Sequence, residues 1–246
     1  MPTTIAISGK GGTGKTTLAA LIVKCLTDRG RTVLAVDADP NTNLNELLGL
    51  EVEETVGDIR EDTRASISDI PAGITKERFI ELRMQQCLVE STGLDLVAMG
   101  HQEGPGCYCY INTLLRGYLG RLHKNYDYVV IDNEAGMEHL SRRTAGDLDL
   151  LLIVSDRSPI ALRAAQRIKG IADSLKLRVR KSGLVLNRTA PDQIGGVAAG
   201  DLEVLGSVPE DELLTAFSMD GRPIAELPSE SKVLRAVAEM MDRLGI

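Results

Sequence analysis

The sequence predicts a single α/β domain, residues 1–246, in which a mostly parallel, doubly wound β-sheet carries helices on both faces. Short runs rich in Val, Ile and Leu recur along the chain. They are continuous rather than alternating, which indicates strands buried on both faces. Stretches with helical period separate these runs, and strand alternating with helix is typical of crossovers in a parallel sheet. A length of 246 residues with 43% hydrophobic residues suits one large domain.

In the first half of the chain, "TTIAIS" at 3–8 is the first expected strand, and the apolar positions of 16–29 repeat with the period of a helix. Two more strands are expected at "RTVLAVD" 31–37 and "LDLVAM" 94–99. Between these two strands, residues 51–92 are the least regular part of the sequence. Their charge-rich start, "EVEETVGDIREDTR", favours an insertion or a mobile lid.

The second half repeats the pattern of strand and helix. Helices are expected over 111–124, 159–176 and 230–244. Strands are expected at "YDYVVID" 126–132, "LLLIVS" 150–155, "SGLVLN" 182–187 and "EVLGSVP" 203–209. The last helix has an apolar stripe but balanced charges, so we expect it to dock on its own core rather than on a membrane.

Charge and cysteine content narrow the function classes. The formal charge of −7 argues against broad binding to nucleic acid or to an anionic membrane. No run approaches the roughly 20 apolar residues that cross a bilayer, and the start has no signal-peptide pattern, so we expect a cytoplasmic protein. In that compartment cysteines are thiols or metal ligands rather than disulfides. Cys25 and Cys87 lie at apolar helical positions and are expected in the core.

The strongest motif is "GKGGTGKT" at 9–16, which matches G-x-x-x-x-G-K-[ST] between a strand and a helix. Its backbone N–H groups face phosphate oxygens, Lys15 neutralises phosphate charge and Thr16 holds Mg²⁺. Motif and context together disfavour a chance glycine-rich turn, so a P-loop NTPase that binds ATP and Mg²⁺ is predicted. The nucleotide-binding residues expected here are Gly11, Gly12, Thr13, Gly14, Lys15, Thr16 and Thr17.

Lys10 is a second lysine in the phosphate loop and is not needed to bind the phosphates of its own subunit. The stretch "KGGTGKTT" resembles the deviant Walker A signature of the MinD/ParA/nitrogenase-iron-protein class of ATPases. The resemblance implies a face-to-face homodimer in which Lys10 reaches the phosphates bound by the other subunit, as an arginine finger would. The alternative is a solvated loop lysine.

Acidic residues at two further strand ends complete the expected catalytic set of Lys10, Lys15, Asp39 and Asp132. "DADPN" at 37–41 follows the second strand; the resemblance implies that Asp39 orients or deprotonates the attacking water and that Asp37 supports magnesium. "VVIDNEAG" at 129–136 resembles a Walker B strand that carries Asp132, with Gly136 in switch II. Each carboxylate alone is equally typical of a helix cap.

Two segments near the C-terminus are expected to bind adenine. "LNR" ends at Arg188, and the class uses an asparagine at the position of Asn187 to recognise the base. "VPEDE" at 208–212 resembles the loop that closes over the base, with contacts from Pro209 and Glu210.

Cys107 and Cys109, in "GPGCYCYINTLLR" at 104–116, follow a strand and so belong to the same sheet edge. Two thiolates suit a soft or borderline metal but make only half of a four-ligand site. A two-fold dimer brings a second pair, which predicts a nickel or zinc ion shared across the dimer. Two buried thiols that only pack are the alternative.

The order of "GCYC", "DNEAGMEHLSR" and "LNR" after the phosphate loop resembles the CooC-type nickel-accessory ATPases. The resemblance implies dimerisation on ATP, Ni²⁺ (or Zn²⁺) at Cys107 and Cys109, and delivery to a client enzyme, carbon monoxide dehydrogenase or acetyl-CoA synthase. An iron–sulfur electron-transfer ATPase of the nitrogenase-iron-protein type and a ParA/MinD-like positioning ATPase are the alternatives.

Overall fold

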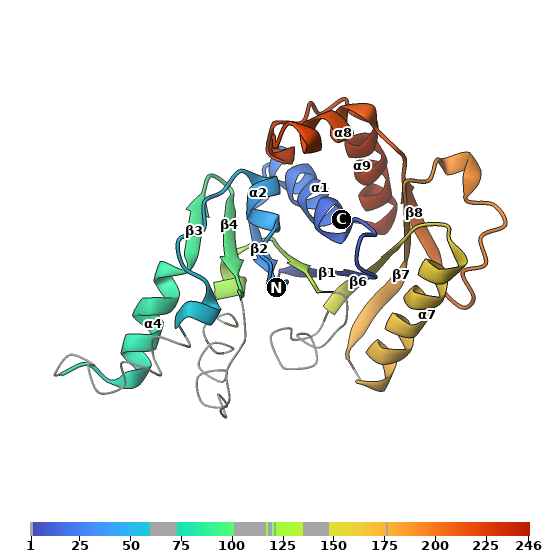
Figure 1. The fold of residues 1–246 in the computed structure, drawn as a ribbon. Coiled ribbons are helices and arrows are strands. Elements are labelled where there is room, and N and C mark those ends of the chain that lie inside the picture. Colours follow the sequence, from blue (N-terminus) through green and yellow to red (C-terminus); the bar gives the residue numbers. More distant parts are fainter. Residues whose placement is uncertain are drawn as a thin grey trace.

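The computed structural model describes residues 2–59, 73–100, 117, 120, 122–134, 148–175 and 177–246. Its centre is one eight-stranded sheet with the order β3-β4-β2-β5-β1-β6-β7-β8 (Figure 1). All neighbouring strands are parallel except β3 and β4. The strands are β1 Thr3–Gly9, β2 Val33–Asp37, β3 Leu88–Ser91, β4 Leu94–Ala98, β5 Tyr128–Asp132, β6 Leu148–Ser155, β7 Val179–Asn187 and β8 Val204–Val208.

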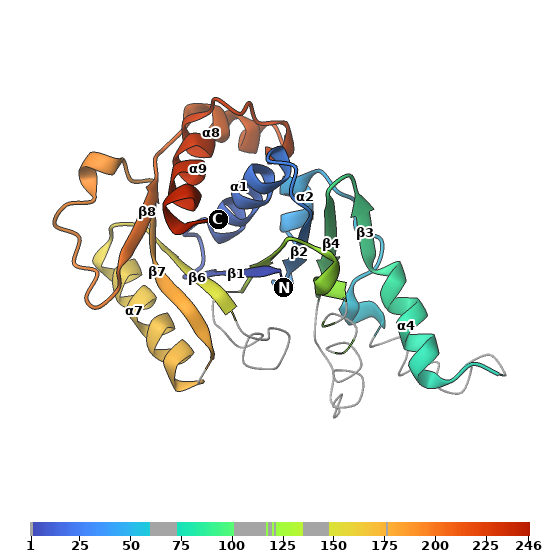
Figure 2. The same cartoon turned by 180° about the vertical axis from the view of Figure 1, so that it is seen from behind.

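Helices cover both faces of this sheet. Helices α1, α8 and α9 lie on one face and α7 on the other, while α4 lies beside the β3 edge (Figures 1 and 2). The α-helices are α1 Lys15–Asp28, α2 Leu44–Leu48, α4 Lys76–Gln86, α7 Pro159–Ser174, α8 Glu212–Met219 and α9 Lys232–Leu244. Short 3₁₀ turns are η1 His123–Asn125, η2 Pro191–Gln193 and η3 Ile224–Glu226. The α/β class and the mostly parallel sheet are confirmed.

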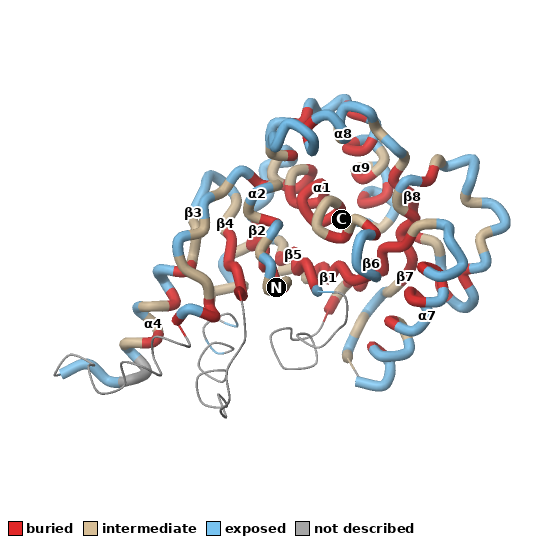
Figure 3. The backbone as a smooth tube through the Cα atoms, in the orientation of Figure 1, coloured by how far each residue is buried: buried red, intermediate tan, exposed pale blue. Residues whose placement is uncertain are grey.

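Two hydrophobic cores hold the layers together. Alternate residues of each central strand enter opposite cores: Ile5 and Ile7 of β1 pack with α1 and α9, whereas Ala6 packs on the α7 side. The buried residues therefore follow the sheet and the inner faces of the helices (Figure 3). The expectation that Cys25 and Cys87 are core residues is confirmed, since both are free and buried.

The C-terminal helix docks on this core, as expected. Val233, Val237 and Met240 of α9 are fully buried, and the Arg29 guanidinium ties the end of the helix to α1 through Asp242 at 2.9 Å. The apolar face of α9 is therefore occupied by the protein's own core.

Residues 51–92 contain regular elements that the sequence pattern did not reveal. Helix α4 places Ile80 and Met84 in the core on the α7 side, and β3 adds an antiparallel strand to the edge of the sheet. The structure leaves residues 60–72 undescribed. The segment therefore holds regular structure at α4 and β3, and its role as an insertion or a lid stays a prediction.

Candidate nucleotide site

The phosphate loop joins the central strand β1 to α1 through two glycines with positive φ. Gly12 and Gly14 have φ values of 78° and 88°, which side-chain-bearing residues rarely adopt. Gly14 is also the N-cap of α1, so the first N–H groups of the helix are directed at the loop. Within the loop, the Thr13 hydroxyl donates to the Lys10 carbonyl at 2.7 Å. This geometry suits phosphate oxygens.

The two lysines of the loop lie in different environments. Lys15 is buried, with 9% of its surface exposed, whereas Lys10 is exposed. Lys10 lies near Asp156, which follows β6: the hydrogen bonds from Ser158 lower the pKa of Asp156, and the positive charges of Lys10 and Arg188 lower it further. Lys10 is therefore exposed on the loop, which is compatible both with the cross-dimer role and with a solvated loop lysine, so its role stays a prediction.

Two neighbouring strands, β2 and β5, bring acidic residues to this edge. In the sheet, β5 lies between β2 and β1, and Asp37 of β2 is the register partner of Asp132 of β5. Asp37 accepts the backbone N–H groups of Asp39 at 3.0 Å and Leu44 at 2.9 Å. Burial nevertheless raises the pKa of Asp37. This carboxylate closes the loop that follows β2.

Asp132 is the buried carboxylate at the end of β5. Only 1% of its surface is exposed, and neither carboxylate oxygen has a hydrogen bond of normal geometry within the described residues. Burial raises the pKa of Asp132 to about 7, although the nearby Thr16 hydroxyl and Lys15 ammonium oppose the shift. An unpaired buried carboxylate next to a hydroxyl is the hard-oxygen donor set that Mg²⁺ prefers. The residues present therefore fit a magnesium ion, which Asp132 and Thr16 would hold.

Asp39 lies in a tight turn after β2. Its Oδ1 accepts the backbone N–H and the side-chain Nδ2–H of Asn41, both at 2.9 Å. The turn is closed by the Thr42 N–H, which donates to the Asp39 carbonyl at 3.1 Å. Asn41 was not among the predicted site residues; the signal for this turn is Asp39, because aspartate side chains commonly accept the backbone N–H two residues on.

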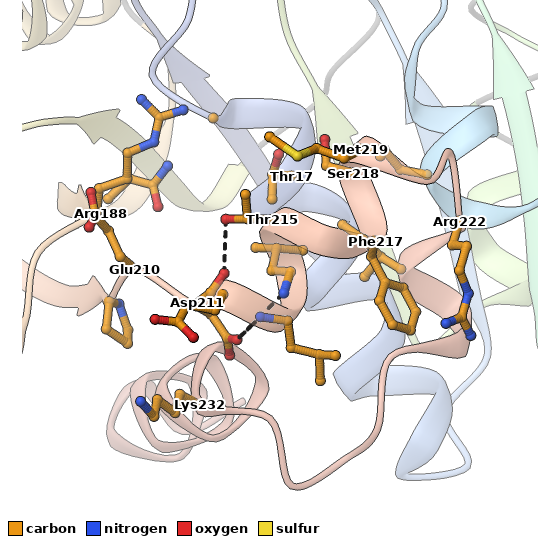
Figure 4. A pocket seen from close by; sticks show the side chains of 18 residues that line it. Thr17, Arg188, Glu210, Asp211, Thr215, Phe217, Ser218, Met219, Arg222 and Lys232 are labelled. Atoms are coloured by element: carbon orange, nitrogen blue, oxygen red, sulfur yellow. Dashed lines mark hydrogen bonds between the residues drawn. The ribbon is translucent and has the colours of Figure 1, made fainter.

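A cavity of about 950 Å³ opens beside the phosphate loop. Figure 4 shows Thr17, Arg188 and Glu210 around it, together with residues of α8. All four residues expected to bind adenine line this cavity, with two from the phosphate loop: Asn187, Arg188, Pro209, Glu210, Gly14 and Thr17. The sequence predictions for both segments thus meet at one place.

Asn187 connects this cavity to the phosphate loop. Its Nδ2 donates to the Thr13 carbonyl at 2.8 Å, across 174 residues of sequence. A Cβ on Gly14 would come within 2.2 Å of the same Nδ2, so only glycine fits there. The next residue, Arg188, has a φ of 51°, a strained value for a residue with a side chain.

Helix α8 forms one wall of this cavity, and this helix was not predicted from the sequence. Asp211 caps it by accepting the N–H of Leu213 at 2.8 Å. The Arg222 guanidinium lies 3.9 Å from the centre of the Phe217 ring and is paired with Glu226 at 3.0 Å. Asp211, which follows Pro209 and Glu210, is a typical helix N-cap residue and was the sequence signal for the start of α8.

The predicted metal-binding cysteines Cys107 and Cys109 lie outside the described residues, as does Gly136. Within the described residues, no group of three or more His, Cys, Asp and Glu side chains could hold a metal ion. Over the same part of the chain, every helix is too short or too polar to cross a bilayer.

Comparison with known proteins shows which family the chain belongs to. The model of the CobQ/CobB/MinD/ParA nucleotide-binding domain family matches residues 4–224. An uncharacterised ATP-binding protein of Methanocaldococcus jannaschii is 40% identical over 98% of this chain and 97% of its own length. The carbon monoxide dehydrogenase accessory protein CooC of Rhodospirillum rubrum is 33% identical over 98% of this chain and 97% of its own.

Solved structures share the fold along the whole chain. A chain of the MinC:MinD cell division complex of Aquifex aeolicus has a TM-score of 0.72 and 25% identity, with 99% of this chain and 96% of that chain covered. MinD of Pyrococcus horikoshii complexed with Mg-ADP has a TM-score of 0.68 and 22% identity, with the same coverage.

Proposed function

Because this chain belongs to the CobQ/CobB/MinD/ParA family of P-loop ATPases, we propose that it hydrolyses ATP as a homodimer and uses the cycle to hold and release a metal ion for a client enzyme. The observation that carries the ATPase half of the proposal is the buried, unpaired carboxylate of Asp132 beside Thr16 and the phosphate loop. Such a group costs stability unless a cation compensates it, which favours a nucleotide–magnesium ligand over a purely structural role.

In this proposal each residue of the sheet edge has one task in the reaction of ATP with water to ADP and phosphate. Lys15 and the loop N–H groups bind the phosphates, and Thr16 and Asp132 hold Mg²⁺, which neutralises charge on the β- and γ-phosphates. Asp39 orients the attacking water. Lys10, which is exposed, reaches the γ-phosphate of the partner subunit.

Asn187 gives a physical reason for the choice of adenine. One of its two Nδ2–H donors is used by the Thr13 carbonyl, which fixes the orientation of the amide, and the contact proposed for the base is through the acceptor Oδ1. An acceptor pairs with the exocyclic amine of adenine and opposes the carbonyl at the same position of guanine. The side chain therefore favours ATP over GTP and links base binding to the loop.

The proposed cargo is a nickel ion held by Cys107 and Cys109 of both subunits. The support is the Cys-x-Cys sequence itself and the 33% identity over 98% of this chain to CooC of Rhodospirillum rubrum, whose name assigns it to carbon monoxide dehydrogenase. Four thiolates make a complete site for a soft or borderline ion, and the thiols lose their protons on binding. Carbon monoxide dehydrogenase or acetyl-CoA synthase is the proposed client.

The test is metal binding in solution. With Ni²⁺ and a non-hydrolysable ATP analogue, we expect a dimer with one nickel ion per two subunits, measured by light scattering and metal analysis of the eluted peak. Cys107→Ser is expected to abolish nickel binding and to leave analogue binding intact. One nickel per monomer, or an unchanged stoichiometry in Cys107→Ser, would remove the shared site while leaving the ATPase assignment in place.

The positioning ATPase remains the second candidate because MinD structures share the fold. The burial of Val233, Val237 and Met240 in the protein's own core argues against a membrane-binding role for α9. Co-sedimentation with anionic liposomes or DNA in the presence of ATP would support the positioning candidate. A brown protein with visible absorption after anaerobic purification would support the iron–sulfur alternative.

A further inference from the structure

The carboxylate of Asp39 is held on one side only. Oδ1 accepts two N–H groups, both from Asn41 and both at 2.9 Å, while Oδ2 has no hydrogen bond within the described part of the chain. Two donors on one oxygen fix the rotation of the carboxylate about its last bond. The second oxygen is thereby left with its acceptor lone pairs in a defined direction.

The turn that carries Asn41 is itself rigid. Asp37 accepts the N–H groups of Asp39 and Leu44, so one buried side chain holds both ends of the loop. Thr42 has a φ of 45°, which is an outlier for a β-branched residue. Strain of this kind persists only where the surroundings impose it, and it concentrates at functional sites.

We propose that Asn41 is a positioning residue for hydrolysis, which aims the free oxygen of Asp39 at the attacking water through its side-chain Nδ2–H bond. This inference rests on the role of Asp39 in the proposed function. The backbone N–H of Asn41 fixes the turn, and any residue at this position supplies it. The Nδ2–H bond is the part that depends on asparagine, and it acts on the orientation of the carboxylate rather than on the binding of ATP.

A purely structural role predicts a different result. If Asn41 only stabilised the loop, its loss would loosen the turn and affect nucleotide binding and folding stability along with turnover. A positioning role lowers kcat and leaves KM and nucleotide affinity almost unchanged, because an interaction made only in the transition state is removed.

The experiment compares Asn41→Ala, Asn41→Ser and the matched control Asn43→Ala in the full chain. Asn43 lies in the same loop and makes no side-chain cap bond to α2. Steady-state hydrolysis of MgATP and binding of a fluorescent ATP analogue are measured for each, with Asp39→Asn as a reference. We expect Asn41→Ala to lose about tenfold in kcat, the size of one charge-assisted hydrogen bond, with KM and analogue affinity within about twofold.

Asn41→Ser keeps a short donor, and we expect it to recover part of the lost kcat, while Asn43→Ala matches the wild type. An unchanged kcat in Asn41→Ala, a loss of analogue affinity, or no recovery in Asn41→Ser would each overturn the inference. Full activity of Asp39→Asn would overturn the role of Asp39 itself. Inactive Asp39→Asn with a fully active Asn41→Ala would remove only the role of Asn41.

Discussion

Asp37 and Asp132 are register partners at the carboxyl ends of neighbouring strands, but their carboxylates differ in hydrogen bonding. Asp37 accepts two backbone N–H groups, whereas Asp132 has no hydrogen bond of normal geometry among the described residues. One carboxylate is therefore part of the scaffold. The other stays available for a ligand, at a cost to the folded state.

Asp132→Asn is expected to stabilise the nucleotide-free protein while it abolishes hydrolysis. Because the folded pKa is raised to about 7, the stability penalty of Asp132 is absent below about pH 4, grows as pH rises through 7 and is constant above that. The amide removes the charge, so at pH 8 we expect a gain of up to about 4 kcal/mol, from about three pKa units of about 1.4 kcal/mol each, that shrinks toward pH 4. Denaturant unfolding at several pH values measures it.

The exposed Asp201→Asn is the control for this gain, and we expect it to change stability little at any pH. A destabilised Asp132→Asn protein at pH 8 would show that the carboxylate is paired in the free protein.

Gly14→Ala is expected to damage both the loop and the base cavity. The new Cβ would lie 2.2 Å from Asn187 Nδ2, at a φ of 88° that alanine adopts only with strain. We expect a loss of about 1–3 kcal/mol in unfolding free energy and a large loss of ATP affinity. Gly11→Ala, where the Cβ has open space, is expected to keep the stability of the wild type. Equal stability of the two variants would contradict the contact with Asn187.

Asn187→Ala is expected to reduce the preference for ATP over GTP. Loss of the bond to the Thr13 carbonyl loosens the loop for both nucleotides, but loss of the acceptor Oδ1 weakens only adenine binding. The ratio of the two dissociation constants therefore isolates the base contact. We expect the ratio to fall about tenfold, equivalent to one hydrogen bond. If both affinities fall by the same factor, the side chain serves only the loop.

Mixing two inactive variants tests whether Lys10 acts across the dimer. Lys10→Ala lacks the lysine and Asp39→Asn lacks the proposed water-orienting group. In a mixed dimer, one site has its own Asp39 and receives Lys10 from the partner subunit. An equimolar mixture should therefore regain about a quarter of wild-type activity, because half the dimers are mixed and each has one complete site. No recovery would place Lys10 in its own subunit's site.

Thiol labelling separates the core cysteines from the proposed metal ligands. Burial raises the pKa of Cys25 to about 11 and that of Cys87 to about 12, so neither forms thiolate at pH 8. We expect the double variant Cys107→Ser, Cys109→Ser to show no fast-reacting thiol in the native state. After unfolding in guanidinium the same variant should show two. Fast native labelling would mean that one of the core sites opens readily.

The sheet could be predicted because its strands are continuous apolar runs, and the site because its residues follow those strands in recognisable motifs. The elements at the β3 edge, α4 and β3, could not be predicted. Among the described side chains of α4, from residue 78 to residue 86, Ile80 and Met84 alone are buried, too few for a clear period. Strand β3 is four residues long and half exposed.

Contacts within the site escaped prediction for another reason. The bond from Asn187 to Thr13 joins residues 174 positions apart, and no local pattern encodes such a pair. The lack of a partner for Asp132 is a property of the packed edge and is likewise invisible in the sequence.

The position of β1 also has a consequence for how the protein is made. The strand that carries the phosphate loop is synthesised well before its two neighbours in the sheet, which begin at residues 128 and 148. A nascent chain must therefore hold this hydrophobic strand unpaired until both neighbours have been synthesised. We expect chaperones to bind this strand during translation, because an exposed apolar strand promotes aggregation.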